Sequence, residues 1–329
     1  MTTTRRQFIG SLTGATTLTT LLAGPAQAQG SWPTKAVRVV VGFPAGGLTD
    51  ALARAYCDYL GQKLGQAVVV ENRAGAAGML AGAEVARAAP DGHTFWFTIT
   101  GSMNQNRVFY KKMPYDPDKD FAYVSGFGAG HLPLAVNASS PVRNMRELVE
   151  LGRKQPITLG NYSIGSLPHM LAQQLNKLYG VQVEPVPYKG EAPMWVDLAS
   201  GQITAAMGSI LALTPHLQSG KVRAIAVPTA QRSQLMPDVP TFLEQGFSEP
   251  VFTIEGWIGM LAPAQTPRDI IKRVSDLVQE AAESPRVRQL NKTFGLPPKP
   301  WTAAEFERLD REAKPRWIEL ARELNVSLD

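Results

Sequence analysis

The chain has 329 residues, with 33 lysines and arginines against 28 aspartates and glutamates, a formal net charge of +5. The charges are scattered and no basic tract with interleaved aromatic residues occurs, which argues against a nucleic-acid partner. About 300 residues exceed what one hydrophobic core usually organises, so two domains are expected. Beyond the N-terminal segment, no run of about 20 apolar residues predicts a membrane span.

The first 28 residues have the pattern of an export signal. Arg5 and Arg6 precede a weakly apolar segment, Ile9–Gly24, which is followed by the small-residue tripeptide Ala26-Gln27-Ala28. The apolar segment is too short, and too rich in glycine and threonine, for a stable membrane span. We therefore predict that residues 1–28 are a twin-arginine signal peptide and that the mature protein is periplasmic.

No motif in the chain calls for a cofactor. The sequence has no paired metal-ligand spacing, no haem-attachment motif and no dinucleotide fingerprint, so neither a metal nor a cofactor is expected. Asp116, Asp118 and Asp120 alternate like a calcium loop but lack its glycine and distal glutamate. Cys57, the only cysteine, lies in an apolar-periodic helix and is predicted to be a buried thiol.

The first part of the chain alternates strands and helices, which predicts a mostly parallel sheet. Its first strand is an apolar run that ends at a Pro/Gly turn, and Thr49 or Asp50 is expected to cap the helix that follows. The predicted elements are strand Val37–Val41, helix Asp50–Leu64, strand Ala67–Val70, helix Gly78–Ala88, strand Phe95–Thr100 and, after a Pro- and Asp-rich connector, strand Phe121–Val124.

A second unit repeats this alternation. Two strand-like segments, Pro133–Asn137 and Phe252–Ala262, bracket it, so the chain is expected to cross into a second domain and return. The predicted domains are residues 29–132 with 254–329, and residues 133–253. The predicted elements are strand Leu132–Val136, helix Asn144–Lys154 with an Asn cap, strand Thr158–Asn161, helix Pro168–Tyr179, strand Glu184–Pro187 and two tail helices that open with caps, Pro267–Glu283 and Thr302–Leu324.

Two strand-to-helix turns are suited to an anion. In the first loop, residues 42–47, Gly46 and Gly47 let the main chain approach a ligand, and amides at the helix start favour a carboxylate or phosphate. In the second loop, residues 162–166, small polar residues precede Pro168 at a helix start and offer further donors. Each loop could equally well be an ordinary strand-to-helix turn that binds no ligand. Facing one cleft, the two loops would clamp a small anion between the domains.

Eight short motifs are spread along the chain. They are Trp32-Pro33, Phe43–Asp50, Val69–Gly75, Ala89–Thr94, Lys112–Asp116, Val186–Gly190, Leu235–Thr241 and Leu261–Pro263. Over almost the whole mature length, the sequence thereby resembles the tripartite tricarboxylate transporter receptor (Bug) family of periplasmic solute-binding proteins.

The resemblance implies an α/β, two-domain type II periplasmic-binding-protein-like fold, with the ligand cleft between the domains. It implies a small carboxylate held by main-chain amides of the two loops and delivered to membrane subunits of a tripartite tricarboxylate transporter. We expect a monomer with no enzymatic activity. Carried over by position, the predicted ligand-binding residues are Phe43, Ala45, Gly46, Gly47, Asp50, Thr100, Gly101, Ser102, Ser163, Gly165, Ser166 and Ser209.

Four departures from the family pattern bear on the ligand. Tyr162, Leu167 and Pro168 replace smaller or polar residues, which predicts a more apolar distal pocket. Relatives often carry an Asp-Asn pair where this chain has Gly208-Ser209, and the lost aspartate argues against a ligand amine. An aromatic or aliphatic mono- or dicarboxylate is therefore expected.

Two other functions stay open. Ser163 or Ser166 with His169 would make an exported serine hydrolase, although the run Gly160–Gly165 is one residue too long for a nucleophile elbow, and His169 is interpreted as a packing residue. A ligand-sensing component of a signalling system would use the same pocket.

Three features beside the loops have two interpretations each. Trp257 either lines the cleft or fills the hinge. Lys189 is left out of the site as a solvated turn residue, and Glu71-Asn72-Arg73 is expected to form a structural network rather than to bind ligand.

Overall fold

The computed structural model describes residues 32–129, 132–229, 231–324 and 327–328. The predicted signal peptide lies outside these ranges. From residue 33 onward the described residues pack as one compact unit, and two sheets organise its two halves. Within the described ranges, no helix has the length and hydrophobicity of a membrane-spanning segment.

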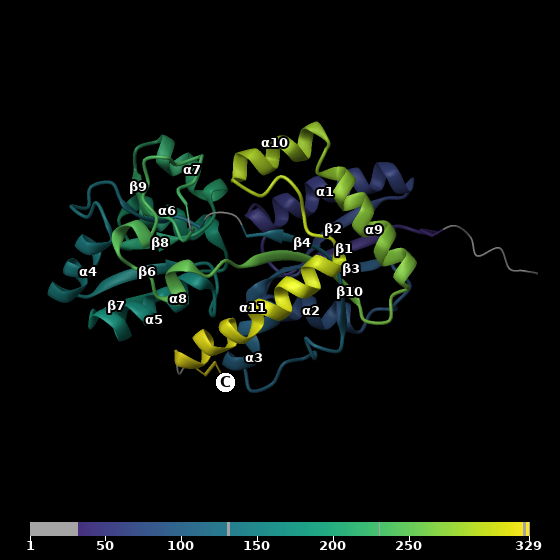
Figure 1. The fold of residues 1–329 in the computed structure, drawn as a ribbon, viewed down its shortest axis with the longest axis horizontal. Coiled ribbons are helices and arrows are strands. Elements are labelled where there is room, and N and C mark those ends of the chain that lie inside the picture. The colour runs from purple at the N-terminus through teal and green to yellow at the C-terminus, as the bar shows by residue number, and fades with distance from the viewer. Residues whose placement is uncertain (1–31, 130–131, 230, 325–326, 329) are drawn as a thin grey trace, which may run out of the picture. The chain divides into compact units, whose positions relative to one another are not determined.

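A first sheet of five strands has the order β2-β1-β3-β10-β4. β1 pairs in parallel with β2 and β3, whereas β10 runs antiparallel between β3 and β4. An interior strand of this sheet, β10, therefore comes from far along the chain (Figure 1). Its strands are β1 (Val37–Val41), β2 (Val68–Asn72), β3 (Thr94–Ile99), β4 (Phe121–Gly128) and β10 (Trp257–Pro263).

The second sheet repeats this plan with the order β7-β6-β8-β5-β9. β6 pairs in parallel with β7 and β8, and β5 runs antiparallel to both of its neighbours. β6 thus occupies the position that β1 has in the first sheet. The strands are β5 (Leu134–Asn137), β6 (Ile157–Asn161), β7 (Val183–Pro187), β8 (Ala205–Met207) and β9 (Val222–Ala226).

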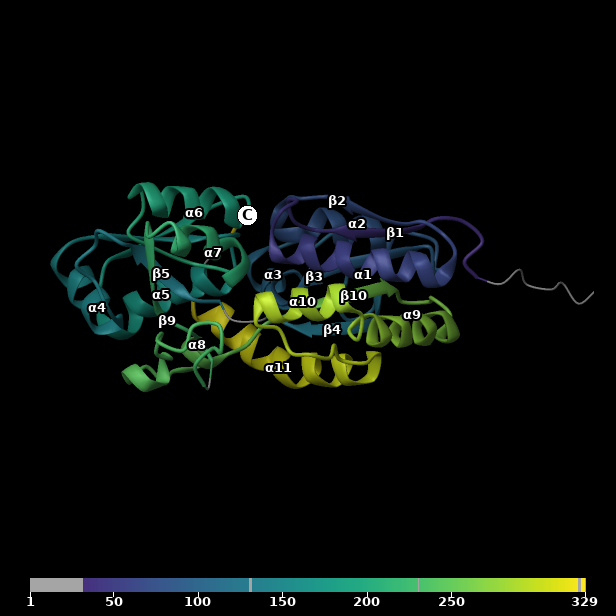
Figure 2. The ribbon, with the colours of Figure 1, turned by 90° about the horizontal axis from the view of Figure 1, so that it is seen from above.

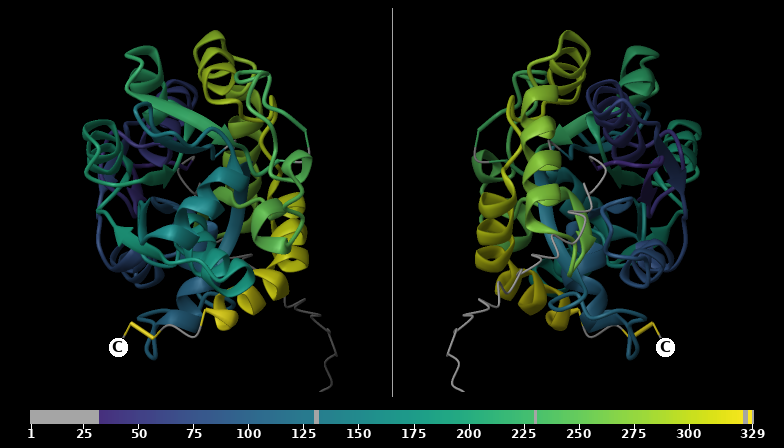
Figure 3. Two further views of the ribbon diagram at one scale, coloured as in Figure 1. Left: turned by 90° about the vertical axis from the view of Figure 1, so that its left-hand side faces the viewer. Right: turned by 90° about the vertical axis from the view of Figure 1, so that its right-hand side faces the viewer.

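Helices pack around both sheets (Figure 3). With the first sheet lie α1 (Leu48–Leu64), η1 (Ala76–Gly78), α2 (Met79–Ala86), the π-helical turn η2 (Gly101–Gln105), α3 (Asn106–Phe109), α9 (Arg268–Ala281), α10 (Pro285–Phe294) and α11 (Ala303–Glu323). With the second lie α4 (Met145–Lys154), α5 (Leu167–Tyr179), α6 (Glu191–Ser200), α7 (Ile210–Gln218), η3 (Leu243–Gln245) and α8 (Pro250–Thr253).

The long helix α11 belongs to both halves (Figures 1 and 2). Near its start, Phe306 packs in a core with Trp96 and Trp257 of the first sheet. Near its end, Trp317 and Leu320 pack in the core of the second sheet. One helix therefore contributes apolar burial, the dominant stabilising term, to both cores.

The sequence-based elements are largely confirmed. β1 has the predicted bounds, and the Asn144 side chain caps α4 by accepting a hydrogen bond from the amide of Glu147. Thr302 and Glu305 form a full capping box at the start of α11. Cys57 is buried, and burial raises the pKa of its thiol, as expected for a core cysteine.

Three predictions about elements are wrong. The cap of α1 is Gly47, so neither Thr49 nor Asp50 caps that helix. Phe252 lies in the short helix α8 instead of a strand, because Pro250 stands in its first turn, where a fixed φ favours a helix start. Helix α9 begins after Pro267 with no side-chain cap.

Candidate functional site

One cavity of about 110 Å³ is lined from both halves of the chain. The first loop contributes Phe43, Ala45 and Gly47, and the second contributes Ser166 after Tyr162. Further lining comes from Leu132, Thr100, Gly101, Gln105, Lys189, Glu191, Trp257 and Trp317. The lining is predominantly apolar with a few polar groups, which is typical of a small-molecule site.

The first loop turns through a left-handed glycine. Gly46 has φ +91°, a conformation that only glycine adopts readily, and Gly47 is then the cap residue of α1. Gly47 itself has φ −86° and has no atom within 4 Å of a Cβ added to it. The conformational need for glycine is therefore at Gly46, while Gly47 leaves open space beside the cavity.

A charged network holds the first loop in place. Asp50 accepts hydrogen bonds from the Gly46 amide (3.1 Å), the Arg54 Nε (3.1 Å) and the Asn72 amide nitrogen (3.0 Å). Asn72 also donates to the Phe43 carbonyl at 2.9 Å. Burial raises the pKa of Asp50, but the bonds from Arg54, Asn72 and Gly46 outweigh it, and the pKa lies below the ordinary value of 3.8. Asp50 is thus an ionised tether of the loop.

The second loop repeats the turn but is held by neutral groups. Gly165 has φ +76° and precedes Ser166, the cap residue of α5. The Gly165 amide donates to His169 Nδ1 at 2.9 Å, and the Ser166 hydroxyl donates to the Ser163 carbonyl at 2.7 Å. Burial lowers the pKa of His169 below its ordinary value of 6.5, so the imidazole is neutral and can accept this bond.

Both loops therefore deliver a helix start to the same cavity. The first amides of an α-helix have no intrahelical acceptor and carry the positive end of the helix dipole. Leu48 and Thr49 at the start of α1 line the cavity, as does Leu167 at the start of α5. Two helix starts converging on one small cavity favour an anion there.

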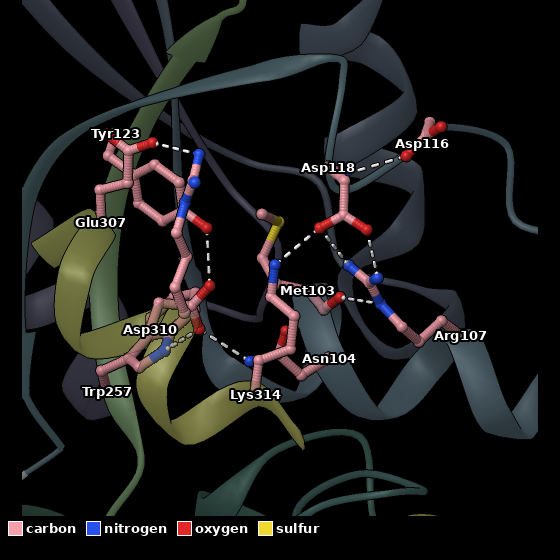
Figure 4. Close-up of polar contacts among 11 residues, drawn as sticks. Met103, Asn104, Arg107, Asp116, Asp118, Tyr123, Trp257, Glu307, Asp310 and Lys314 are labelled. Carbon is pink, nitrogen blue, oxygen red and sulfur yellow. Dashed lines mark hydrogen bonds and ion pairs between the residues drawn. The ribbon is translucent and has the colours of Figure 1, made fainter. Parts of the chain in front are cut away.

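Thr100 joins the third strand to the returning strand behind the cavity. Its hydroxyl accepts from the Trp257 amide at 2.6 Å and donates to the Trp257 carbonyl at 3.2 Å. The Trp257 indole donates to Asp310 at 2.8 Å, and Asn104 and Tyr123 donate to the same carboxylate at 2.8 and 2.6 Å (Figure 4). Trp257 therefore lines the cavity in a fixed orientation.

A second charged cluster anchors the segment after β3 (Figure 4). Asp118 pairs with Arg107 and with Lys314 of α11, each at 2.6 Å. The hydrogen bond from Arg107 is the main reason that the pKa of Asp118 lies far below its usual range. These contacts link α11 to α3, directly after the turn that carries Thr100 and Gly101.

The predicted site residues fall into two groups. Phe43, Ala45, Gly47, Thr100, Gly101 and Ser166 line the cavity. The others lie beside or behind it: Gly46 and Asp50 bond each other, Ser102 donates to the Ala77 carbonyl, Gly165 bonds His169, Ser209 bonds Glu191, and Ser163 lines a neighbouring cavity. For this second group, the contacts point to support of the lining rather than to ligand contact.

Sequence reasoning passed over several lining residues. Lys189, set aside as a solvated turn residue, lines the cavity, and so do Glu191 and Trp317. The Tyr-Lys-Gly motif was visible, but its place beside the first loop depends on tertiary packing: a Cβ added to Gly190 would lie 3.5 Å from Pro44. Glu71-Asn72-Arg73 is a structural network as expected, with Arg38 paired to Glu71 at 2.8 Å.

A neighbouring cavity of about 460 Å³ shares part of this wall. Phe43, Pro44, Tyr162, Lys189 and Gly190 line both spaces. The larger space also borders the left-handed turn of Ala76 and Ala77.

The hydrolase geometry is not present in the second loop. Ser166 uses its hydroxyl on the Ser163 carbonyl, and His169 Nδ1 accepts from the Gly165 amide. In the part of the chain that the structure describes, no hydrogen bond joins either serine to His169. Among those residues, no group of three or more His, Cys, Asp and Glu side chains is arranged to hold a metal ion.

The fold and site define a class: a two-domain periplasmic-binding-protein fold of type II, with a ligand cavity lined from both halves. The family model described as "Tripartite tricarboxylate transporter family receptor" matches residues 52–326. The chain belongs to this family of solute-binding receptors.

Solved structures give the same result. The periplasmic binding protein BugD is 30% identical with a TM-score of 0.82, covering 90% of this chain and 99% of that one. Rpa4515 of R. palustris, solved with adipate, is 32% identical with a TM-score of 0.84, covering 90% and 99%. MatC of Rhodopseudomonas palustris, solved with malate, is 30% identical with a TM-score of 0.79, covering 88% and 99%.

Proposed function

We propose that this receptor binds a small carboxylate in the 110 Å³ cavity and delivers it to the membrane subunits of a tripartite tricarboxylate transporter. One observation carries the proposal: two helix starts, each preceded by a left-handed glycine, line a single apolar cavity. Adipate and malate in two similar structures support a carboxylate as the ligand.

The proposal includes the domain arrangement. Residues 29–132 with 254–329 form one domain and residues 133–253 the other, and closure of the cleft buries the ligand against both loops. Strands of the first sheet lie at 37–128 and 257–263, and those of the second lie at 134–226, which supports this division. Residues 1–28 direct the protein to the periplasm, where it acts as a monomer without turnover.

Within the site, we assign the anion contact to the first-turn amides of α1 and α5. Phe43 and Trp257 supply apolar contact area, and Gly47 leaves the first loop open to close approach. Asp50, Gly165 and Ser209 act by holding the lining in place.

A thermal-shift screen tests the proposal. Protein lacking residues 1–28 is heated with mono- and dicarboxylates, aromatic acids, amino acids and neutral controls. A ligand at one hundred times its Kd adds about 2.7 kcal/mol of stability, which raises the Tm visibly. Stabilisation by carboxylates and not by neutral analogues is expected. Carboxylate-independent stabilisation would contradict the proposal, and ester turnover lost in Ser166→Ala would favour the hydrolase instead.

Gly47→Val separates binding from folding. The φ of Gly47 and the open space at its Cβ position permit a valine, so the Tm of the variant without ligand should stay close to that of the wild type. The branched side chain would occupy the ligand's place, and the shift should disappear. Thr293→Val, at an exposed position of α10 that does not line the cavity, is the control. Equal shifts in wild type and Gly47→Val would remove the first loop from the site.

A further inference from the structure

A carboxylate forms part of the wall of the proposed anion cavity. Glu191 is the first residue of α6, directly after the cap residue Gly190, and it lines the cavity. The Gly190 amide donates to the Tyr162 carbonyl at 3.2 Å, which ties the start of α6 to the second loop. Glu191 therefore adds a negative side chain, placed at the start of its own helix, to a cavity whose two other helix starts favour an anionic ligand.

Ser209 fixes the position of this carboxylate. The Ser209 amide donates to Glu191 Oε1 at 2.8 Å, and the Ser209 hydroxyl donates to Oε2. Ser209 is only 1% exposed and is itself the cap residue of α7, so it cannot follow a moving side chain. Glu191 is therefore part of a built wall and is not a freely rotating surface residue.

The carboxylate lacks a cation. Within the described ranges, no Lys, Arg or His nitrogen lies within 4.0 Å of Glu191, although Lys189 lines the same cavity. Burial raises the pKa of Glu191, and the bonds from Ser209 oppose this only in part. A carboxylate in an apolar cavity is costly unless a positive partner reaches it.

The Glu191 carboxylate also fills space beside Gly208. A Cβ added to Gly208 would lie 3.2 Å from Glu191 Oε1 and 3.0 Å from atoms of Met194 and Trp195. A larger side chain at 208 and the Glu191 carboxylate would therefore compete for the same place. The missing aspartate at 208 was the sequence-based reason against a ligand amine, and Glu191 supplies a carboxylate at this same part of the wall.

We infer that Glu191 selects ligands that carry a positively charged amine in addition to the carboxylate held by the two loops. The inference rests on the proposed function and narrows its ligand class from carboxylates in general to amino-carboxylates. An ammonium group beside Glu191 would pair two charges that the cavity removes from water. A second ligand carboxylate at the same place would instead put two like charges together.

Matched ligands test this selection. Isothermal titration compares three sets in which the terminal group alone changes: adipate, hexanoate and 6-aminohexanoate; succinate, butyrate and 4-aminobutyrate; glutarate, pentanoate and 5-aminopentanoate. Wild-type protein should bind the amine-bearing member of at least one set about tenfold or more tightly than its diacid and monoacid partners. Diacids binding as tightly as the amines in every set would overturn the inference, without any variant being needed.

Glu191→Gln then assigns the preference to this side chain. Glutamine keeps an acceptor for the Ser209 amide and removes the charge, so the amine preference should fall about tenfold while monoacid affinity is retained. Glu150→Gln, an exposed glutamate on α4, is the matched control and should change nothing. An unchanged amine preference in Glu191→Gln overturns the role of Glu191.

The outcomes also separate this inference from the proposed function. If monoacids and diacids bind but amines gain nothing, the carboxylate receptor stands and the role of Glu191 falls. If no carboxylate in any set binds to correctly folded protein, both fall together.

Discussion

The two loops of the cavity share a backbone plan and differ in what holds them. Each places a left-handed glycine one residue before the cap of a helix, at equivalent positions in sheets of the same strand order. The first loop is tied by the ionised carboxylate of Asp50, and the second by the neutral imidazole of His169. The two loops thus share one backbone geometry, but the groups that hold them respond differently to mutation and to pH.

The largest expected difference lies at the two left-handed glycines. At Gly165, an added Cβ would lie 2.7 Å from the Phe109 ring, whereas at Gly46 it meets no atom within 4 Å. Gly46→Ala should therefore cost only the backbone term, about 1–2 kcal/mol. Gly165→Ala adds overpacking and should cost about 2–4 kcal/mol. Urea unfolding of both variants measures this, and equal costs would show that Phe109 yields freely.

The charged tether is the next target. Asp50→Ala leaves the Gly46 amide without its acceptor and removes one of the two acceptors of the Asn72 side-chain amide, so a loss of about 2–3 kcal/mol is expected. This exceeds the effect of losing a helix cap alone, about 1 kcal/mol. Asp58 lies on α1, like Asp50, and forms an exposed ion pair with Arg286 of α10, so Asp58→Ala should cost less than about 1 kcal/mol. Similar losses in both variants would refute the tether.

A second neutral contact of the second loop, the Ser166 hydroxyl bond, is expected to be weaker than the Asp50 tether. Ser166→Ala removes the hydroxyl that donates to the Ser163 carbonyl, at an expected cost of about 0.5–1.5 kcal/mol by chemical denaturation. Ser139→Ala, whose hydroxyl bonds Asn137 at an exposed turn, serves as the comparison and should cost less. A larger cost for Ser139→Ala would contradict the role given to Ser166.

The smallest expected effect is a difference in how the stability of the two loops depends on pH. The folded-state pKa of His169 is lowered below 6.5, so its contribution is complete above pH 6.5 and is lost as the pH falls below that value. The pKa of Asp50 is lowered below 3.8, so the first loop weakens only under stronger acid. Thermal unfolding from pH 7.5 to 5 measures this. In His169→Asn, which keeps a neutral acceptor, the loss should be smaller; an unchanged pH profile would exclude His169 as its source.

The sequence carried the parts of this fold that have strong local signals. Val37–Val41 has four valines and one arginine and forms an interior strand of its sheet. Asn144 is a helix cap with Glu147 in the first turn, so both elements were predictable from local rules. β8 has only three residues and α7 contains Pro215, so neither shows a readable period. Their existence is decided by packing against neighbours that sequence periodicity does not report.

The candidate site shows the same division. Both loops were recognisable because glycine and helix-start signals are local. Glu191 was not, because its importance depends on Ser209, 18 residues away, and on the space left by Gly208. Trp317 reaches the cavity only because α11 packs against both cores. A local sequence motif cannot indicate residues that reach the cavity from distant elements of the fold.

The interleaved strand order has a consequence for how the polypeptide is made. β3 and β4 cannot be joined until β10, Trp257–Pro263, leaves the ribosome, whereas the strands of the second sheet lie in one continuous stretch. During synthesis, the second sheet can therefore finish while the first still shows open edges at β3 and β4, the kind of surface that invites aggregation. Nascent chains stalled before residue 257 should be the species that most need a chaperone.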